Sequence, residues 1–174
     1  MDNKLRLVPM YSFNKCTDIS PGFLKLLGIK FIMLDLDNTI AKYSEHAPSA
    51  TAKKWVEDMA ISNITLYFIS NSKREHRVRT FSEALDIPYI NNAQKPSPDS
   101  LHAAMKTAGF RQDETAFVGD QIFTDTLASN RAKVASIIVR PLSLKNPLLL
   151  LRFIAELPFR AICAIKSNKS KLSL

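Results

Sequence analysis

The stretch FIMLDLDNTI, residues 31–40, decides the fold. Its first four residues are all apolar, which is typical of a strand buried on both faces of a parallel sheet. Asp35 and Asp37 follow directly, separated by one leucine. Two carboxylates at the end of a buried strand indicate either a turn capped by aspartate or a metal-dependent reaction centre. The rest of the chain distinguishes these alternatives.

Buried strands and amphipathic helices alternate along the chain. Apolar runs predict strands, and apolar residues at helical spacing predict helices. Asp18 or Ser20 as a cap, Pro21 at an early position and Gly28 at the end mark the first helix. The expected strands are 31–34, 64–70, 115–120 and 134–140, with a short extended piece at 88–91, and the expected helices are 18–30, 48–63, 73–86, 97–109 and 124–133. This alternation predicts an α/β fold, a doubly wound, Rossmann-like parallel sheet with helices on both faces.

Polar side chains follow three of the predicted strands. Asp35 and Asp37, Ser70, and Asp120 each come directly after an apolar run or close it. Ligands of such sheets bind outside the carboxyl ends of the strands. We therefore expect these groups to meet at one edge of the sheet.

Clustered carboxylates repel one another unless a cation lies between them. Hard oxygen ligands with room for water and phosphate suit Mg²⁺. VGDQIFTD supplies Asp120 and Asp125, and NAQKPSPD supplies Lys95, a cation that can neutralise a carboxylate or a transferring phosphoryl group. ISNS supplies Ser70 and Asn71 just before a helix, where backbone N–H groups attract anions.

Each of these motifs has an ordinary structural interpretation when taken alone. DxDNT can be a turn, GDxxxxD and KPSPD can be capped helices with their loops, and SNS is usually a turn. Their appearance in order, each after a buried strand, favours a reaction centre over four unrelated loops.

The set D-x-D-x-T, Ser after an apolar strand, Lys-Pro and G-D-x-x-x-x-D resembles the four motifs of the haloacid dehalogenase-like phosphatases, over residues 35–125. Residues 5–150 more closely resemble the YqeG-type branch, which is similar to the mitochondrial phosphatidylglycerophosphate phosphatases. The resemblance implies a phosphoric monoester hydrolase of the HAD fold, with Mg²⁺ as cofactor and an aspartyl-phosphate intermediate. For the branch, it implies phosphatidylglycerophosphate as substrate, in phosphatidylglycerol and cardiolipin synthesis.

The resemblance also implies roles for individual residues. Asp35 would attack phosphorus, and Asp37 would protonate the leaving oxygen and then activate water. The metal would be held by the Asp35 side chain, the Asp37 carbonyl oxygen and Asp120, with Asp125 supporting the metal site or orienting Lys95.

Phosphoryl oxygens would be bound by Ser70, Asn71 and Lys95. The strongly basic helix start that follows adds Arg74 or Arg77 as a contact for a second phosphate on the substrate. The alternative for these arginines is a solvated helix face.

No segment between the motifs is long enough for a cap domain. Asp35 and Ser70 are separated by 34 residues, and Ser70 and Lys95 by 24. We therefore expect an open site without a cap domain, which suits a large or membrane-bound substrate.

The positive charge is concentrated near the C-terminus. The formal net charge is +8, and residues 140–174 hold seven basic groups and one acid, Glu156. We divide the chain into a phosphatase domain, 1–140, and a basic amphipathic tail, 141–174. Arg152, Glu156 and Arg160 share one helical face of that tail, whose longest uncharged run is too short to span a bilayer. The tail is expected to lie on a membrane surface through 148–171, or to pack on protein.

These features lead to one first expectation and two alternatives. The first is a cytoplasmic enzyme, peripheral at the inner face of the membrane, that acts on a phosphorylated lipid headgroup. The second is a phosphatase for nucleotides, nucleic-acid ends or phosphoproteins, although the leucine-rich tail favours a membrane over nucleic acid, which is not expected as a partner. The third is a non-catalytic scaffold that binds through the basic tail. The widely separated Cys16 and Cys163 suit a reducing compartment.

Overall fold

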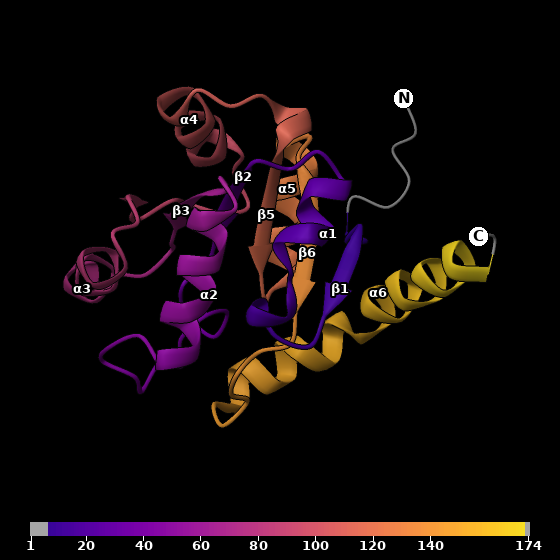
Figure 1. The fold of residues 1–174 in the computed structure, drawn as a ribbon. Helices are drawn as coiled ribbons and strands as arrows, with labels where there is room; N and C mark the ends of the chain where they lie inside the picture. The colour runs from indigo at the N-terminus through magenta and orange to yellow at the C-terminus, as the bar shows by residue number, and fades with distance from the viewer. Residues whose placement is uncertain (1–6, 173–174) are drawn as a thin grey trace.

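A single parallel sheet organises the molecule. The structure is a computed structural model that describes residues 7–172, and their side chains as far as residue 164. Its strands follow the order β1-β6-β5-β2-β3-β4 (Figure 1). They are β1 (Tyr11–Phe13), β2 (Phe31–Leu34), β3 (Thr65–Ile69), β4 (Tyr89–Ile90), β5 (Thr115–Gly119) and β6 (Ala135–Val139), and every pairing is parallel. The expected α/β doubly wound sheet is confirmed.

Helices connect the strands. They are α1 (Pro21–Leu26), α2 (Ala50–Ile61), α3 (Glu75–Leu85), α4 (Asp99–Ala108), α5 (Leu127–Ala132) and α6 (Pro147–Leu172), with short turns η1 (Cys16–Asp18) and η2 (Gln112–Glu114) and a π-helical turn η3 (Ile122–Thr126). One helix, α2, joins β2 to β3, and α3 joins β3 to β4, so the two places where a cap domain was ruled out from segment length each hold a single helix.

The alternation of side chains along β2 divides the core into two layers. Ile32 and Leu34 pack with the buried residues of α1, α2 and α3. Phe31 and Met33 point to the other face, where they pack with α4 and α5. Because both faces are covered, β2 is apolar throughout, and its first polar side chain, Asp35, appears only where the strand ends.

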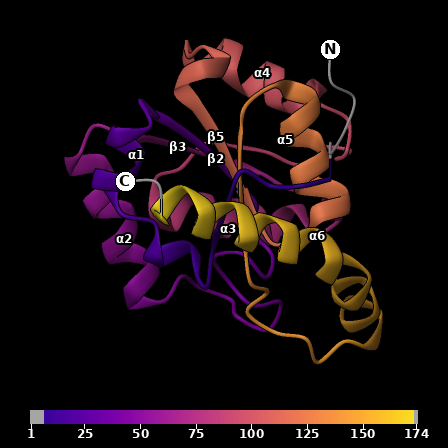
Figure 2. The same cartoon turned by 90° about the vertical axis from the view of Figure 1, so that its right-hand side faces the viewer.

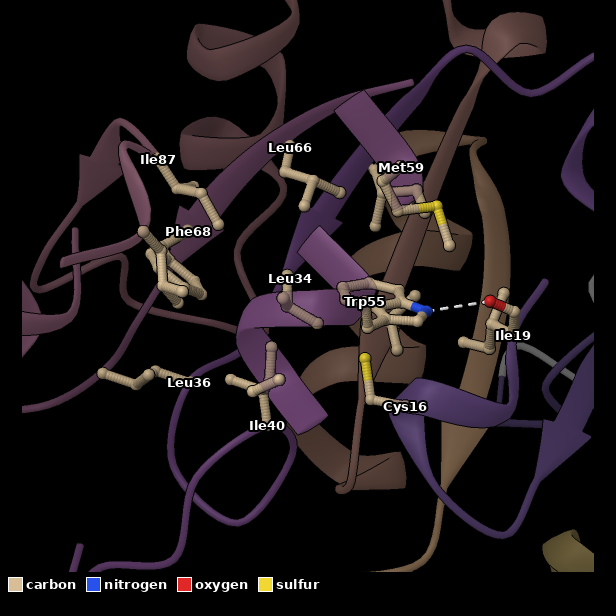
Figure 3. Packing of buried hydrophobic residues seen from close by; sticks show 14 of the residues in the cluster. Cys16, Ile19, Leu34, Leu36, Ile40, Trp55, Met59, Leu66, Phe68 and Ile87 are labelled. Atoms are coloured by element: carbon tan, nitrogen blue, oxygen red, sulfur yellow. Dashed lines mark hydrogen bonds between the residues drawn. The ribbon is translucent and has the colours of Figure 1, made fainter. Parts of the chain in front are cut away.

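Trp55 on α2 ties one helical layer to the N-terminal segment. Its indole N–H donates to the carbonyl oxygen of Ile19 over 2.8 Å, and Cys16 and Met59 lie beside the ring (Figure 3). The large ring is buried, and its one polar group has a partner, which is how tryptophan is usually accommodated in a core. The contact therefore fixes α2 against the N-terminal segment around Ile19.

The described elements match most of the sequence-based expectations, with three differences. The helix expected over 18–30 is shorter, because Ser20 accepts from the Phe23 amide and Pro21 begins α1, while Gly28 at φ 71° ends the segment. The helix expected over 124–133 divides into η3 and α5. Strand β1 was not expected, since its three residues pair with β6 at the sheet edge and carry no periodic signal of their own.

Helix α6 begins beneath the carboxyl ends of the strands and runs along the β1 edge (Figures 1 and 2). It contacts both β1 and η3. The division into a domain, 1–140, and a tail, 141–174, stays a prediction, but within the described side chains of the tail Glu156 and Cys163 are buried. Within the described residues, no helix combines the length and apolarity needed to cross a bilayer.

Candidate active site

Neighbouring strands deliver the expected polar groups to one edge. Asp35 follows β2, Ser70 follows β3 and Asp120 follows β5, and these three strands are adjacent in the sheet. At this edge lies a cavity of about 870 Å³, whose lining includes Asp35, Ser70 and also Asp37. The expected groups therefore meet at one edge of the sheet, where ligands of parallel sheets bind.

Lys95 joins two of the carboxylates. Its Nζ lies 2.6 Å from Asp35 Oδ1 and 2.8 Å from Asp125 Oδ1, and it also donates to the Ile69 carbonyl oxygen over 2.9 Å. The lysine side chain is only 2% exposed. A buried ammonium group is costly unless its donors are all paired, so these three acceptors fix its position closely.

The loop that carries Lys95 is held by Asn71. The Asn71 side chain accepts from the Lys95 backbone N–H and donates to the Lys95 carbonyl oxygen, both over 2.9 Å. The Ser70 hydroxyl accepts from the Ser72 amide over 3.0 Å. Both residues line the cavity, and the Asn71 side chain holds the lysine loop. Phosphate binding by Ser70 and Asn71 stays a prediction.

Asp125 reaches Lys95 because Gly119 has no side chain. A Cβ atom built on Gly119 would lie 2.3 Å from Asp125 Oδ2, well inside van der Waals contact. The same oxygen accepts from the Gln121 backbone N–H over 3.0 Å. Asp125 sits in the π-helical turn η3, a form that is frequent at functional sites.

Three carboxylates form a cluster that can hold a divalent cation. Ligand oxygens of Asp35, Asp120 and Asp125 all lie within 4.8 Å of one another, and all three residues are buried. The Thr39 hydroxyl bridges Asp35 Oδ2 and Asp120 Oδ1 at 3.4 Å each. Lys95 engages Asp125 Oδ1 and Asp35 Oδ1, so Asp35 Oδ2 and the Asp120 carboxylate, which meet at Thr39, are the oxygens of the donor set that suits a hard cation.

The electrostatics reflect a buried site that is rich in carboxyl groups. Burial raises the pKa of Asp35 to about 7; Lys95 opposes this rise, while Asp125 and Asp37 add to it. Burial, and then Asp125 and Asp35, also raise the pKa of Asp120 well above its usual value. Burial alone would lower the pKa of Lys95, but its two carboxylate partners outweigh burial and raise it. A bound cation would favour the ionised carboxylates and so oppose both the burial and the repulsion that raise these pKa values.

The two arginines expected near a second phosphate lie in different environments. Arg74 is exposed and lines the cavity. Arg77 is buried and is absent from the cavity lining; its Nε donates to Asp37 Oδ1 over 2.8 Å. Arg74 therefore faces the cavity, whereas Arg77 is paired with Asp37 of the DLDNT motif.

Helix α6 supplies a further buried ion pair that contacts the same edge. Glu156 accepts from the Ile122 amide over 2.8 Å and the Phe123 amide over 3.3 Å at the start of η3. Arg160 pairs with Glu156 at 3.2 Å and donates to the backbone carbonyl oxygen of Asp120. The tail therefore takes part in positioning the loop that carries two of the three clustered carboxylates.

A family model for haloacid dehalogenase-like hydrolases matches residues 22–133, well over half of the chain. The chain is also 33% identical, over 150 residues and 85% of both chains, to a Bacillus subtilis (strain 168) protein named "Probable phosphatase YqeG". The chain belongs to the haloacid dehalogenase-like hydrolases. These two matches confirm the expectation of a phosphatase of this family, in its YqeG-type branch.

Solved structures of low sequence identity share the fold. One is the cobalt-bound deoxy-D-mannose-octulosonate 8-phosphate phosphatase (YrbI) of Haemophilus influenzae, with 17% identity and a TM-score of 0.51 over 66% of this chain and 70% of that chain. Another is an uncharacterized protein of Listeria monocytogenes serotype 4b, with 18% identity and a TM-score of 0.53 over 69% and 80% of the two chains. At these identities the likeness supports the haloacid dehalogenase-like fold.

Sequence reasoning did not identify Thr39, Glu156 and Arg160 as parts of the site. The DxDNT motif contained Thr39, but its hydroxyl became relevant only when Asp120 was found opposite. The spacing by four of Glu156 and Arg160 indicated a shared helical face, and the structure shows that this face points toward η3.

The raised pKa of Asp35 predicts how stability depends on pH without metal. Between about pH 4 and pH 7 the folded protein retains a proton that the unfolded chain has lost, so the free energy of unfolding should fall as pH rises. The slope for one proton is at most about 1.4 kcal/mol per pH unit. Thermal unfolding in a chelator should therefore show a falling Tm over this range.

Addition of Mg²⁺ should raise Tm more at pH 7.5 than at pH 5, because protons compete with the cation for the same oxygens. The control is Asp35→Asn, whose Tm in chelator should vary less with pH. An equal effect of Mg²⁺ at both pH values would contradict a metal site built on these carboxylates.

The Glu156 contacts predict a large effect from a distant substitution. Glu156→Ala leaves two buried amides and Arg160 without their acceptor, and should lower the free energy of unfolding by about 3 kcal/mol. Denaturant unfolding measures this, with Glu57→Ala on the exposed side of α2 as the matched control. Equal, small effects of the two substitutions would show that α6 does not support η3.

Proposed function

We propose that the chain is a Mg²⁺-dependent phosphomonoester hydrolase that forms an aspartyl-phosphate at Asp35 and acts on phosphatidylglycerophosphate. The observation that carries this proposal is the cavity at the sheet edge. It brings Asp35 and Asp37 together with a rim of basic side chains contributed by several segments, and Lys42, Lys73, Arg74, Lys145 and Arg152 all line it.

The donor set supports Mg²⁺ as the cation. Asp35 and Asp120 offer carboxylate oxygens, and the Asp37 backbone carbonyl oxygen is the third protein ligand that we propose. Such oxygen ligands suit Mg²⁺, which when bound neutralises charge on the phosphoryl oxygens. Asp125 would act through Lys95, to which it is already paired.

The two aspartates of DLDNT have different roles in the proposed reaction, Asp35 as nucleophile and Asp37 as general acid and base. In the first step an Asp35 oxygen bonds to phosphorus, the bond from phosphorus to the ester oxygen breaks, and Asp37 gives its proton to that oxygen. In the second step Asp37 takes a proton from water, which attacks phosphorus and releases Asp35 and inorganic phosphate. Lys95 would hold Asp35 in place, and its positive charge would stabilise the phosphoryl group beside it. Because its three donors are paired with Asp35, Asp125 and the Ile69 carbonyl oxygen, direct binding of a phosphoryl oxygen would require one of them to change its acceptor.

The basic side chains at the cavity rim favour a substrate that carries a second anionic group. Arg74 is exposed at the rim, and we propose that it contacts the second phosphate of phosphatidylglycerophosphate. Lys145, from the segment before α6, and Arg152, from α6 itself, add positive charge to the cavity lining. A cationic rim around an open cavity favours a multiply charged headgroup over a neutral sugar phosphate.

Helix α6 supports action at a membrane surface. Its first half exposes large apolar side chains, with Leu148 at 76%, Leu151 at 66% and Ile154 at 52% of their full exposure. Residues three apart share one side of a helix, so these side chains form a stripe next to the cavity, which Leu149 lines. We propose that this stripe lies in the headgroup region of the inner face of the cytoplasmic membrane. The side chains of Lys166, Lys169 and Lys171, also expected to contact lipid, lie outside the described ones.

A panel of phosphate esters tests the proposal. Phosphatidylglycerophosphate in mixed micelles, a 5′-nucleotide, a phosphopeptide and a sugar phosphate should be compared at saturating Mg²⁺, by release of inorganic phosphate. We expect the lipid to give the highest kcat/KM, and a chelator to abolish release. Fast turnover of the sugar phosphate with none of the lipid would contradict the substrate, and preference for the nucleotide or phosphopeptide would favour those classes instead.

Asp35→Asn is the control for this panel. It should retain the fold, because Asn occupies nearly the same volume, and should release no phosphate from any of the four esters. Phosphate release by this variant at the wild-type rate would contradict Asp35 as nucleophile. Absence of release by the wild-type chain itself, with Mg²⁺ present, would favour the scaffold interpretation.

A further inference from the structure

Arg77 is the one arginine on the first turns of α3 that turns inward, since Arg74 and Arg79 are exposed. Its guanidinium group donates to Asp37 Oδ1 over 2.8 Å, to the Lys42 carbonyl oxygen over 2.7 Å and to the Glu45 carbonyl oxygen. It also lies over the Phe81 ring, 4.8 Å from the centroid. Four different contacts thus fix one planar group.

These contacts give Arg77 a role different from binding substrate. An arginine that is 8% exposed is stable in the interior only when its charge and donors are paired, and here Asp37 and two carbonyl oxygens pair them. Using the same group for a substrate phosphate would break the pair. The contacts instead connect Asp37 to the loop of Lys42 and Glu45, whose residues 42–44 form part of the cavity wall.

The pair also distinguishes the two oxygens of Asp37. Oδ1 accepts from Arg77, and Asp37 lines the cavity, so Oδ2 is the oxygen left to meet a substrate. Proton transfer requires the donor oxygen within hydrogen-bond reach of the ester oxygen, and a misplacement of about 1 Å can cost about 100-fold in rate. The Nε–H bond to Oδ1 comes from a guanidinium group that is itself fixed by the Lys42 and Glu45 carbonyl oxygens, and it restricts the rotation that would otherwise interchange the two oxygens.

We propose that Arg77 is a positioning residue that holds Asp37 with Oδ2 facing the ester oxygen, and thereby determines how well the enzyme cleaves esters of poor leaving groups. The inference rests on the proposed phosphatase chemistry. In the step concerned, the proton on Oδ2 moves to the ester oxygen as its bond to phosphorus breaks, while Arg77 stays protonated and bound to Oδ1.

A comparison of leaving groups tests this role. Benzyl phosphate and p-nitrophenyl phosphate are similar in size, but only the benzyl alkoxide needs a proton to leave. The parameter is kcat/KM, which covers the steps up to release of the first product and excludes hydrolysis of the phosphoenzyme. Arg77→Lys keeps the charge and loses the fork, so we expect the ratio of kcat/KM for benzyl phosphate to that for p-nitrophenyl phosphate to fall at least about tenfold, within the range that general acids contribute. The matched control is Arg79→Lys on the exposed side of α3, which should keep the wild-type ratio.

A double-mutant cycle separates positioning from a purely structural role. If Arg77 acts through Asp37, Arg77→Lys should cause little further loss on benzyl phosphate in an Asp37→Asn background. Equal loss on both esters, or full additivity in the cycle, would overturn the proposal.

If Arg77→Lys does not fold, a second variant still tests the role of Arg77. Phe81→Leu retains the arginine but removes the ring beneath it, and should lower the same ratio by a smaller factor; an unchanged ratio would count against the proposal. If the wild-type chain hydrolyses neither ester, the proposed phosphatase function fails, which is a different result from a wild-type ratio that Arg77→Lys does not change.

Discussion

The buried ammonium group of Lys95 is the interaction on which the rest of the site depends. It lies between Asp35 and Asp125, with the Ile69 carbonyl oxygen as third acceptor, in a region nearly closed to water. Charges in such surroundings interact more strongly than in water, and each is costly without its partner. The arrangement therefore requires an Asn71 that holds the lysine loop and a Gly119 that lets Asp125 approach.

Two helices far apart in the sequence support the two sides of this centre. Arg77 on α3 holds Asp37, and Glu156 with Arg160 on α6 holds the loop after β5 that carries Asp120 and Asp125. In both cases a buried charged pair connects a helix to an aspartate or its loop. The parallel sheet brings the strand ends together, and the helices then fix the directions in which the side chains point.

The sequence predicted the elements that follow from local patterns. Asp35, Ser70 and Asp120 could be placed at one edge because each follows a strand and parallel strands end on the same side. The partner of Arg77 could not be predicted, because a basic helix start gives no sign of which residue turns inward. Likewise, the spacing of Glu156 and Arg160 identified a helical face, but which surface it contacts depends on how α6 crosses the sheet edge. Strand β1 is held by pairing with β6, a long-range contact that three residues do not encode.

The central claim is tested most directly by identifying the side chain that becomes phosphorylated in the first step. Asp37→Asn with p-nitrophenyl phosphate should allow the first step, which needs no proton for this leaving group, and slow the second, which needs a base for water. Acid quenching followed by mass spectrometry of the proteolytic peptides should then find phosphate on Asp35. Phosphate on any other side chain, or continued turnover in the Asp35→Asn variant, would contradict it.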